Sequence, residues 1–130
     1  MRQGVRLVAI NKLRAHEQVS PQRLAEVMGL IKKQGMIVNP IVIDRKYKII
    51  LDGHHRVESL RRLNCLLAPV MEVDYFSNQV RVRTRRKNIL ISKEIVVRQV
   101  VNNHIFPNKT TRHLIKNRIR GVKIKLNQLK

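Results

Sequence analysis

The chain contains few residues of the kinds that mark secreted, membrane-spanning or disulfide-linked proteins. Its single cysteine, Cys65, cannot form an internal disulfide or a CxxC metal or redox motif. Its apolar stretches are far shorter than the roughly 20 residues that span a bilayer. Residues 1–6 lack the apolar run of a secretory signal. These absences predict a cytoplasmic protein without membrane insertion.

Acidic residues are also scarce. The sequence holds 28 lysines and arginines against 8 aspartates and glutamates, which gives a formal net charge of +20. Residues 1–74 contain 13 basic and 7 acidic residues, a net charge of +6, whereas residues 75–130 contain 15 and 1, a net charge of +14. Such a field attracts phosphates, whether from nucleic acid, nucleotides or an anionic membrane surface. Charge alone does not choose among these partners.

Aromatic residues make up only 3% of the chain, but 43% of its residues are hydrophobic. We therefore expect a core of isoleucine, valine and leucine. A length of 130 residues favours a single domain. We divide it into a core, residues 1–75, and a basic C-terminal part, residues 76–130. The patterns predict an α+β fold with a small mixed sheet and about three helices.

Capping residues and apolar spacing locate the secondary structure. Helices are predicted from Ser20-Pro21 to Gly35, from about His54 to Asn64, and from Ser92 to Asn102. Strands are predicted at residues 5–10, 40–44, 48–51, 69–75 and 122–126. The arginine-rich residues 81–87 indicate a basic ribbon or loop. Residues 108–120 are predicted to form a loop with at most one helical turn.

The first motif that can carry chemistry is the junction between a strand and a helix at Asp52-Gly53-His54-His55-Arg56. Backbone N–H groups at a helix N-terminus are unpaired, and a glycine lets a phosphate approach the chain closely. The alternative is an ordinary Asp-Gly turn whose histidines are surface residues. Two histidines followed by an arginine favour the anion site.

The second motif is Lys109-Thr110-Thr111-Arg112-His113. Arginine offers a fork of donors and threonine a directed hydrogen bond, so the segment is suited to a phosphate or carboxylate. A solvated loop is the alternative in a chain this basic.

The third motif is the pair His16-Glu17, in the connection before the first helix. A carboxylate that faces a phosphate site can take the proton of an attacking hydroxyl. The alternative is an exposed surface glutamate. Zinc binding by the histidines is disfavoured, because none shows the HExxH spacing of a zinc enzyme.

These stretches together resemble the ParB/sulfiredoxin superfamily over about residues 5–75. The resemblance is carried by Leu13-Arg-Ala-His16-Glu17, the helix after Ser20-Pro21, Pro40-Ile-Val-Ile-Asp44, Ile49-Ile-Leu-Asp52-Gly53-His54-His55-Arg56 and the strand at 69–75. The Asp-Gly-His-His-Arg form is similar to that of the free serine kinases of archaea and of a related bacterial siderophore-pathway enzyme. Residues 107–113 are similar to the Pro-Lys-Thr-Thr-Arg-His segment of those kinases.

The resemblance implies phosphoryl transfer from a nucleotide, ADP or ATP, to the hydroxyl of free L-serine. Glu17 would be the base, and His55 is a second catalytic candidate. The implied phosphate-binding residues are Asp52, Gly53, His54, His55, Arg56, Lys109, Thr110, Thr111, Arg112 and His113. Asp52 would meet Mg²⁺ directly or through water.

The other branches of the superfamily match less well at the same positions. ParB proteins carry Gly-Glu-Arg-Arg where this chain has Gly53-His54-His55-Arg56, and sulfiredoxin needs a cysteine at the position of His54. A ParB-like protein that binds DNA or RNA nevertheless remains the alternative, because of the excess positive charge. Its candidate residues are Arg81, Arg83, Arg85, Arg86, Lys87, Lys116, Arg118, Arg120, Lys123 and Lys125. The oligomeric state is left open.

Overall fold

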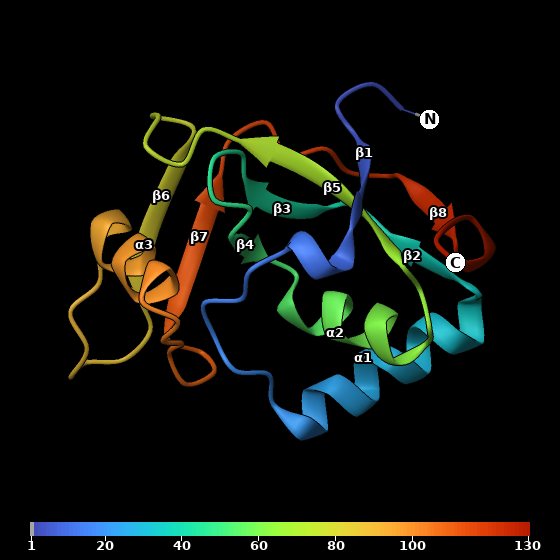
Figure 1. The fold of residues 1–130 in the computed structure, drawn as a ribbon, viewed down its shortest axis with the longest axis horizontal. Helices are drawn as coiled ribbons and strands as arrows, with labels where there is room; N and C mark the ends of the chain where they lie inside the picture. The colour runs from blue at the N-terminus through green and yellow to red at the C-terminus, as the bar shows by residue number, and fades with distance from the viewer. Residues whose placement is uncertain (1) are drawn as a thin grey trace.

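The computed structural model describes residues 2–130 and has the predicted α+β architecture (Figure 1). Its main sheet has four strands in the order β1-β5-β3-β4. These strands are β1 (Arg6–Ala9), β3 (Ile41–Asp44), β4 (Ile50–Asp52) and β5 (Leu67–Val73). Because β3 runs parallel to β5 and antiparallel to β4, the sheet is mixed, as predicted.

Helices α1 (Pro21–Gln34) and α2 (His54–Arg62) pack on one side of this sheet (Figure 1). The caps of α1 are those that the sequence predicts. Ser20 Oγ accepts a hydrogen bond from the backbone N–H of Arg23, and Gly35 ends the helix with a φ of 67°. Leu24 and Ile31, seven residues apart, are its buried side chains. All four residues of β3 are buried, so this strand forms the centre of the core.

The C-terminal region adds a two-stranded antiparallel ribbon, β6 (Val80–Thr84) with β7 (Thr111–Ile115), and the helix α3 (Lys93–Val101). Ser92 caps α3 as predicted, since its Oγ accepts from the N–H of Ile95. The prediction of a loop at residues 108–120 was wrong, because five of these residues form β7. Thr111 and His113 occupy buried positions that apolar residues hold in a typical strand, which hid the alternation.

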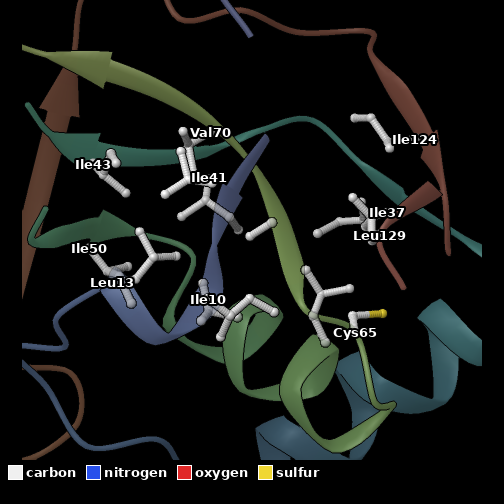
Figure 2. Packing of buried hydrophobic residues seen from close by; sticks show 14 residues of the cluster. Ile10, Leu13, Ile37, Ile41, Ile43, Ile50, Cys65, Val70, Ile124 and Leu129 are labelled. Carbon is white, nitrogen blue, oxygen red and sulfur yellow. The ribbon is translucent and has the colours of Figure 1, made fainter. Parts of the chain in front are cut away.

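The short strand β2 (Met36–Val38) was not predicted. It pairs with β8 (Lys123–Lys125), which lies within the strand predicted at 122–126, and the 3₁₀ turn Leu126–Gln128 follows. Figure 2 shows Ile124 beside β2, and Ile37 next to Leu129, among the buried residues of the main core. Residues from near the C-terminus therefore complete the core that the N-terminal sheet begins.

Cys65 belongs to the same core cluster and is a free, buried thiol (Figure 2). Burial raises the pKa of the Cys65 thiol, which keeps it in the less reactive protonated form. A second 3₁₀ turn, Ile10–Lys12, joins β1 to the connection that carries the His16-Glu17 pair. Within residues 2–130, none of the helices is long and apolar enough to cross a membrane.

Candidate active site

One large cavity, with a volume of about 1010 Å³, brings the three sequence motifs together. It is bounded by the segment before α1, the junction of β4 with α2, and β7. Figure 1 shows β4 next to β7, although some sixty residues separate them in sequence. The predicted residues that line the cavity are Glu17, Asp52, Gly53, His54, His55, Arg56, Lys109, Thr111, Arg112 and His113. Stretches that are far apart in the sequence thus form one site.

Gly53 makes the sharp turn between β4 and α2. Its φ of 116° lies in the left-handed region, and a Cβ at this position would lie 2.7 Å from Cδ1 of Ile41. A side chain is therefore excluded by both conformation and space. Gly53 is also the N-cap of α2, and no side chain among residues 2–130 caps this helix end. The first N–H groups of α2 are left to bind an anion at the cavity.

Asp52, the last residue of β4, is held by two arginines. Oδ2 of Asp52 lies 2.5 Å from Nη2 of Arg118 and 3.6 Å from Nη2 of Arg56. Burial acts to raise the pKa of this carboxyl, but the hydrogen bond and charge of Arg118 outweigh burial and lower the pKa. Asp52 is therefore ionised at neutral pH. Arg118, predicted only as a nucleic-acid contact, ties the C-terminal segment to the strand–helix junction.

Glu17 is anchored by the first residue of β7. Its Oε2 accepts hydrogen bonds from the backbone N–H of Thr111 at 2.8 Å and from Thr111 Oγ1 at 2.5 Å. Burial acts to raise the pKa of Glu17, but hydrogen bonds from His16 and Thr111 outweigh it and bring the pKa to about 2. The glutamate predicted as the base is thus ionised over the physiological range.

Three histidines around the site are neutral. His54 Nε2 accepts the backbone N–H of His16 at 3.2 Å, and His55 Nε2 accepts that of Ser20 at 3.0 Å. A nitrogen that accepts a hydrogen bond from an N–H group carries no proton. Burial, followed by the charge of His16, lowers the pKa of His54 and of His113 to about 3.

His16 is the functional residue whose role the sequence did not indicate. Its side chain is completely buried. Nδ1 of His16 lies 2.8 Å from the carbonyl oxygen of Ile50, and Nε2 lies 2.7 Å from Thr111 Oγ1. Its position directly before Glu17 was the one available signal, because Thr111 is 95 residues away in sequence.

Thr110 is the member of the second motif that lies apart from the cavity. Its side chain is fully buried, and its Oγ1 donates to the carbonyl oxygen of Pro107 at 2.7 Å. This bond stabilises the turn before β7 and leaves the neighbouring Thr111 to contact Glu17.

The residues predicted for nucleic acid are divided between two places. The cavity is lined by Arg81, Arg85, Lys116, Arg118 and Arg120. The remaining five, which are not part of its lining in the described chain, are Arg83, Arg86, Lys87, Lys123 and Lys125. Five of the ten residues predicted for nucleic acid therefore face the same space as the phosphate-binding motifs.

Comparison with known proteins finds similarity to serine kinases over part of the chain. No family model matches the sequence. A protein of Staphylothermus marinus named ATP-dependent L-serine kinase is 32% identical over 83 residues, which are 60% of this chain and 32% of that protein. A ParB-like protein of Sulfolobus acidocaldarius is 36% identical over 76 residues, which are 58% of this chain and 38% of that protein. The chain thus spans about a third of the length of the relatives that it matches.

Solved structures share the fold over the whole chain. A free serine kinase in complex with AMP superposes with a TM-score of 0.89 at 16% sequence identity, and the match covers 100% of this chain and 95% of that one. At this identity the likeness concerns the fold alone. The structural match and the partial sequence match together confirm the resemblance to the ParB/sulfiredoxin superfamily, and within it to the free serine kinases.

Proposed function

We propose that the chain is a nucleotide-dependent phosphotransferase that phosphorylates the hydroxyl group of a small acceptor, L-serine. The observation that carries this proposal is the shared cavity, which contains an ionised glutamate, an uncapped helix N-terminus and several cations. The chemistry of phosphoryl transfer needs these groups, because catalysis there consists mainly of positioning and charge stabilisation. The names of the relatives support L-serine as the acceptor. The predicted cytoplasmic location is part of the same proposal.

The phosphates of the nucleotide, ADP or ATP, would lie against the N-terminus of α2. Gly53 allows close approach there, while Lys109 and Arg112, which also line the cavity, supply positive charge. The backbone N–H groups of α2 and these cations can then neutralise the phosphate oxygens. His55 also lines the cavity. Because its Nε2 accepts the backbone N–H of Ser20, it holds the start of α1 next to the start of α2.

Asp52 fits the role of a magnesium ligand. Both arginine contacts reach its Oδ2, so the second oxygen, Oδ1, stays available to a hydrated cation. Mg²⁺ is usually bound by one or two carboxylates together with substrate phosphates and water. When bound, the ion would neutralise charge on the phosphates during transfer.

In the transfer step, the acceptor hydroxyl donates a hydrogen bond to Glu17. Its oxygen forms a bond to the terminal phosphorus, and the bond from phosphorus to the leaving oxygen of the nucleotide breaks with its electron pair. The acceptor's proton passes to the Glu17 carboxylate and later to water. Because the pKa of Glu17 is about 2, this carboxylate serves mainly to orient the hydroxyl, with proton transfer late in the step.

The direct test is an assay of O-phosphoserine formation with ADP or ATP, Mg²⁺ and L-serine. We expect turnover with at least one nucleotide, and a loss of roughly 10²- to 10⁴-fold in kcat for Glu17→Gln. Glu26→Gln is the matched control, because Glu26 is an exposed residue of α1 that pairs with Arg23. Absence of phosphoserine with both nucleotides, or full activity of Glu17→Gln, would contradict the proposal.

Nucleic-acid binding is the second candidate function, favoured by exposed arginines along β6. Arg83 and Lys87 are exposed and lie apart from the cavity lining, so substituting them tests this function separately. If DNA or RNA binds, Arg83→Gln with Lys87→Gln should reduce the slope of log affinity against log salt by about 2. Lys32→Gln with Lys33→Gln, in exposed positions on α1, is the control. No detectable binding at about 50 mM salt would exclude this function.

A further inference from the structure

A continuous chain of hydrogen bonds runs behind Glu17 into the protein. It begins at the carbonyl oxygen of Ile50, passes through both ring nitrogens of His16 and then through the hydroxyl of Thr111, and ends at Oε2 of Glu17. The three links measure 2.8, 2.7 and 2.5 Å. Three different parts of the fold supply its members: β4, the connection before α1, and β7.

The protons in this chain can be counted from the acceptors. The carbonyl oxygen of Ile50 only accepts, so Nδ1 of His16 carries a proton. Oε2 of Glu17 accepts the backbone N–H of Thr111 as well as the hydroxyl, which is consistent with the ionised carboxylate that its lowered pKa indicates. The single proton of the Thr111 hydroxyl is therefore directed at Glu17. Nε2 of His16 must then donate to Thr111 Oγ1, so His16 carries a proton on both nitrogens.

The surroundings of His16 are consistent with one positive charge at this place. The titratable groups placed against it are Glu17, whose Oε2 lies 3.5 Å from Nε2 of His16, His54 at the start of α2, and His113 from β7. The ring centroids of His54 and His113 lie 4.6 and 5.3 Å from that of His16. Burial and the neighbouring charge of His16 both lower the pKa of these two histidines, so they stay neutral. Glu17 supplies the compensating negative charge.

We propose that His16 is a buried imidazolium that holds Glu17 ionised and in one orientation, both through the Thr111 hydroxyl and by its own charge, since Nε2 of His16 lies 3.5 Å from Oε2 of Glu17. His16 is thus a positioning residue for the transfer step, and this inference rests on the proposed function. These hydrogen bonds hold Oε2 of Glu17 on the protein side of the carboxylate and leave Oε1 for the acceptor hydroxyl. Without these hydrogen bonds, burial would dominate the pKa of Glu17 and raise it. Burial favours the protonated acid, which cannot accept a proton.

The first test measures protonation directly and needs no enzymatic turnover. In the full chain labelled with ¹⁵N at its histidines, NMR at pH 8 reports how many protons each ring carries. An unperturbed histidine, with a pKa of about 6.5, is almost fully neutral at this pH. We expect His16, assigned through its contact with the Thr111 methyl group, to be doubly protonated in the native protein and neutral in Glu17→Gln.

Two NMR outcomes would overturn the proposal. One is a neutral His16 in the native protein at pH 8. The other is a His16 that stays doubly protonated in Glu17→Gln, because its charge would then not depend on the carboxylate. Both outcomes can be observed whether or not the protein phosphorylates serine, so failure of this inference is distinguishable from failure of the proposed function.

The second test uses the pH dependence of kcat. Thr111→Val removes the hydroxyl that joins the two residues but keeps the backbone N–H. We expect kcat to fall about 10- to 100-fold, and the acid limb of its pH profile to move up by about 1 to 2 pH units. The KM for nucleotide should change less than about twofold, because the Thr111 hydroxyl is already engaged by Glu17 and His16 and is not left for a phosphate. Thr111→Ser, which retains a hydroxyl, should restore both values. A Thr111→Val profile with an unchanged acid limb would refute the relay.

Discussion

Residues 2–75 and residues 76–130 contribute different things to one site. The first region contains the four-stranded sheet and both helices that pack on it, and it supplies the two carboxylates that line the cavity in the described chain, Glu17 and Asp52. The second region holds a two-stranded ribbon rich in arginine. Each carboxylate is nevertheless held by a residue of the second region, Glu17 by Thr111 and Asp52 by Arg118.

This difference shows that the N-terminal region has a complete sheet but does not form the site without residues of the C-terminal region. The N-terminal region supplies the two carboxylates, but their charge and orientation depend on contacts that span 94 and 66 residues of sequence. The strong positive charge of the C-terminal region is therefore not only a surface property. Part of it stabilises the ionised form of a carboxylate in the cavity. Three substitutions test this comparison: two break contacts between the regions, and one acts within the N-terminal region alone.

The largest effect is expected from Leu129→Ala. Leu129 is fully buried in the main core, next to Ile37 of β2. Truncating a buried leucine removes apolar contacts and leaves a cavity, so the free energy of unfolding should fall by about 2–5 kcal/mol. Denaturant titration measures it. Leu90→Ala, at a position that is 82% exposed, is the control and should change stability by less than about 0.5 kcal/mol. Equal effects of the two would show that the C-terminus does not support the core.

An intermediate effect is expected from Gly53→Ala, within the N-terminal region alone. The left-handed φ and the close approach of Ile41 Cδ1 both oppose a Cβ, so we expect a loss of about 1–3 kcal/mol in stability. Gly29→Ala is a well-matched control, because Gly29 lies inside α1 with nothing within 4 Å of its Cβ position. That change should stabilise the protein by about 0.4–1 kcal/mol. Thermal unfolding of both variants measures the two changes in stability. If Gly29→Ala also destabilised the protein, the loss in Gly53→Ala could not be assigned to the special backbone conformation of Gly53.

The smallest effect is expected from Arg118→Gln, which breaks a contact between the regions. Because the pKa of Asp52 is lowered in the folded protein, this pair stabilises the fold above the ordinary carboxyl pKa of 3.8 and loses that effect as the pH falls through the lowered value. Asp52 is partly exposed, so the loss at pH 7 should be at most about 1 kcal/mol. Carboxyl NMR titration should show the pKa of Asp52 rising in Arg118→Gln but not in Arg98→Gln. An unshifted Asp52 would mean that Arg118 does not control it.

Local signals predicted much of the fold. The caps Ser20 and Ser92 and the terminating Gly35 placed α1 and α3 within one or two residues, because each acts through neighbours in sequence. The loop prediction at residues 108–120 failed because this segment is shaped by contacts that are distant in sequence. β7 is defined by pairing with β6 and by inward-facing Thr111 and His113, whose polar character serves the cavity. Because its inward-facing positions hold polar residues, β7 does not show the apolar alternation of a strand that packs in a hydrophobic core.

The candidate site was predicted in the same uneven way. Glu17 and the junction at Asp52–Arg56 could be recognised because each motif is contiguous, and both line the cavity. The role of His16 could not be, because it follows from contacts with Ile50 and Thr111 that only the folded chain creates. The sequence likewise could not show that Thr110 faces Pro107 while its neighbour Thr111 faces Glu17.

The burial of Ile124 and Leu129 against the first sheet also bears on how the protein is synthesised. A ribosome delivers the chain from its N-terminus, yet the main core joins Val8 to Leu129. The apolar surface around Ile37 must stay open to water, or be covered by a chaperone, until translation has passed position 129. Final closure of this core therefore follows the synthesis of residues 124–129.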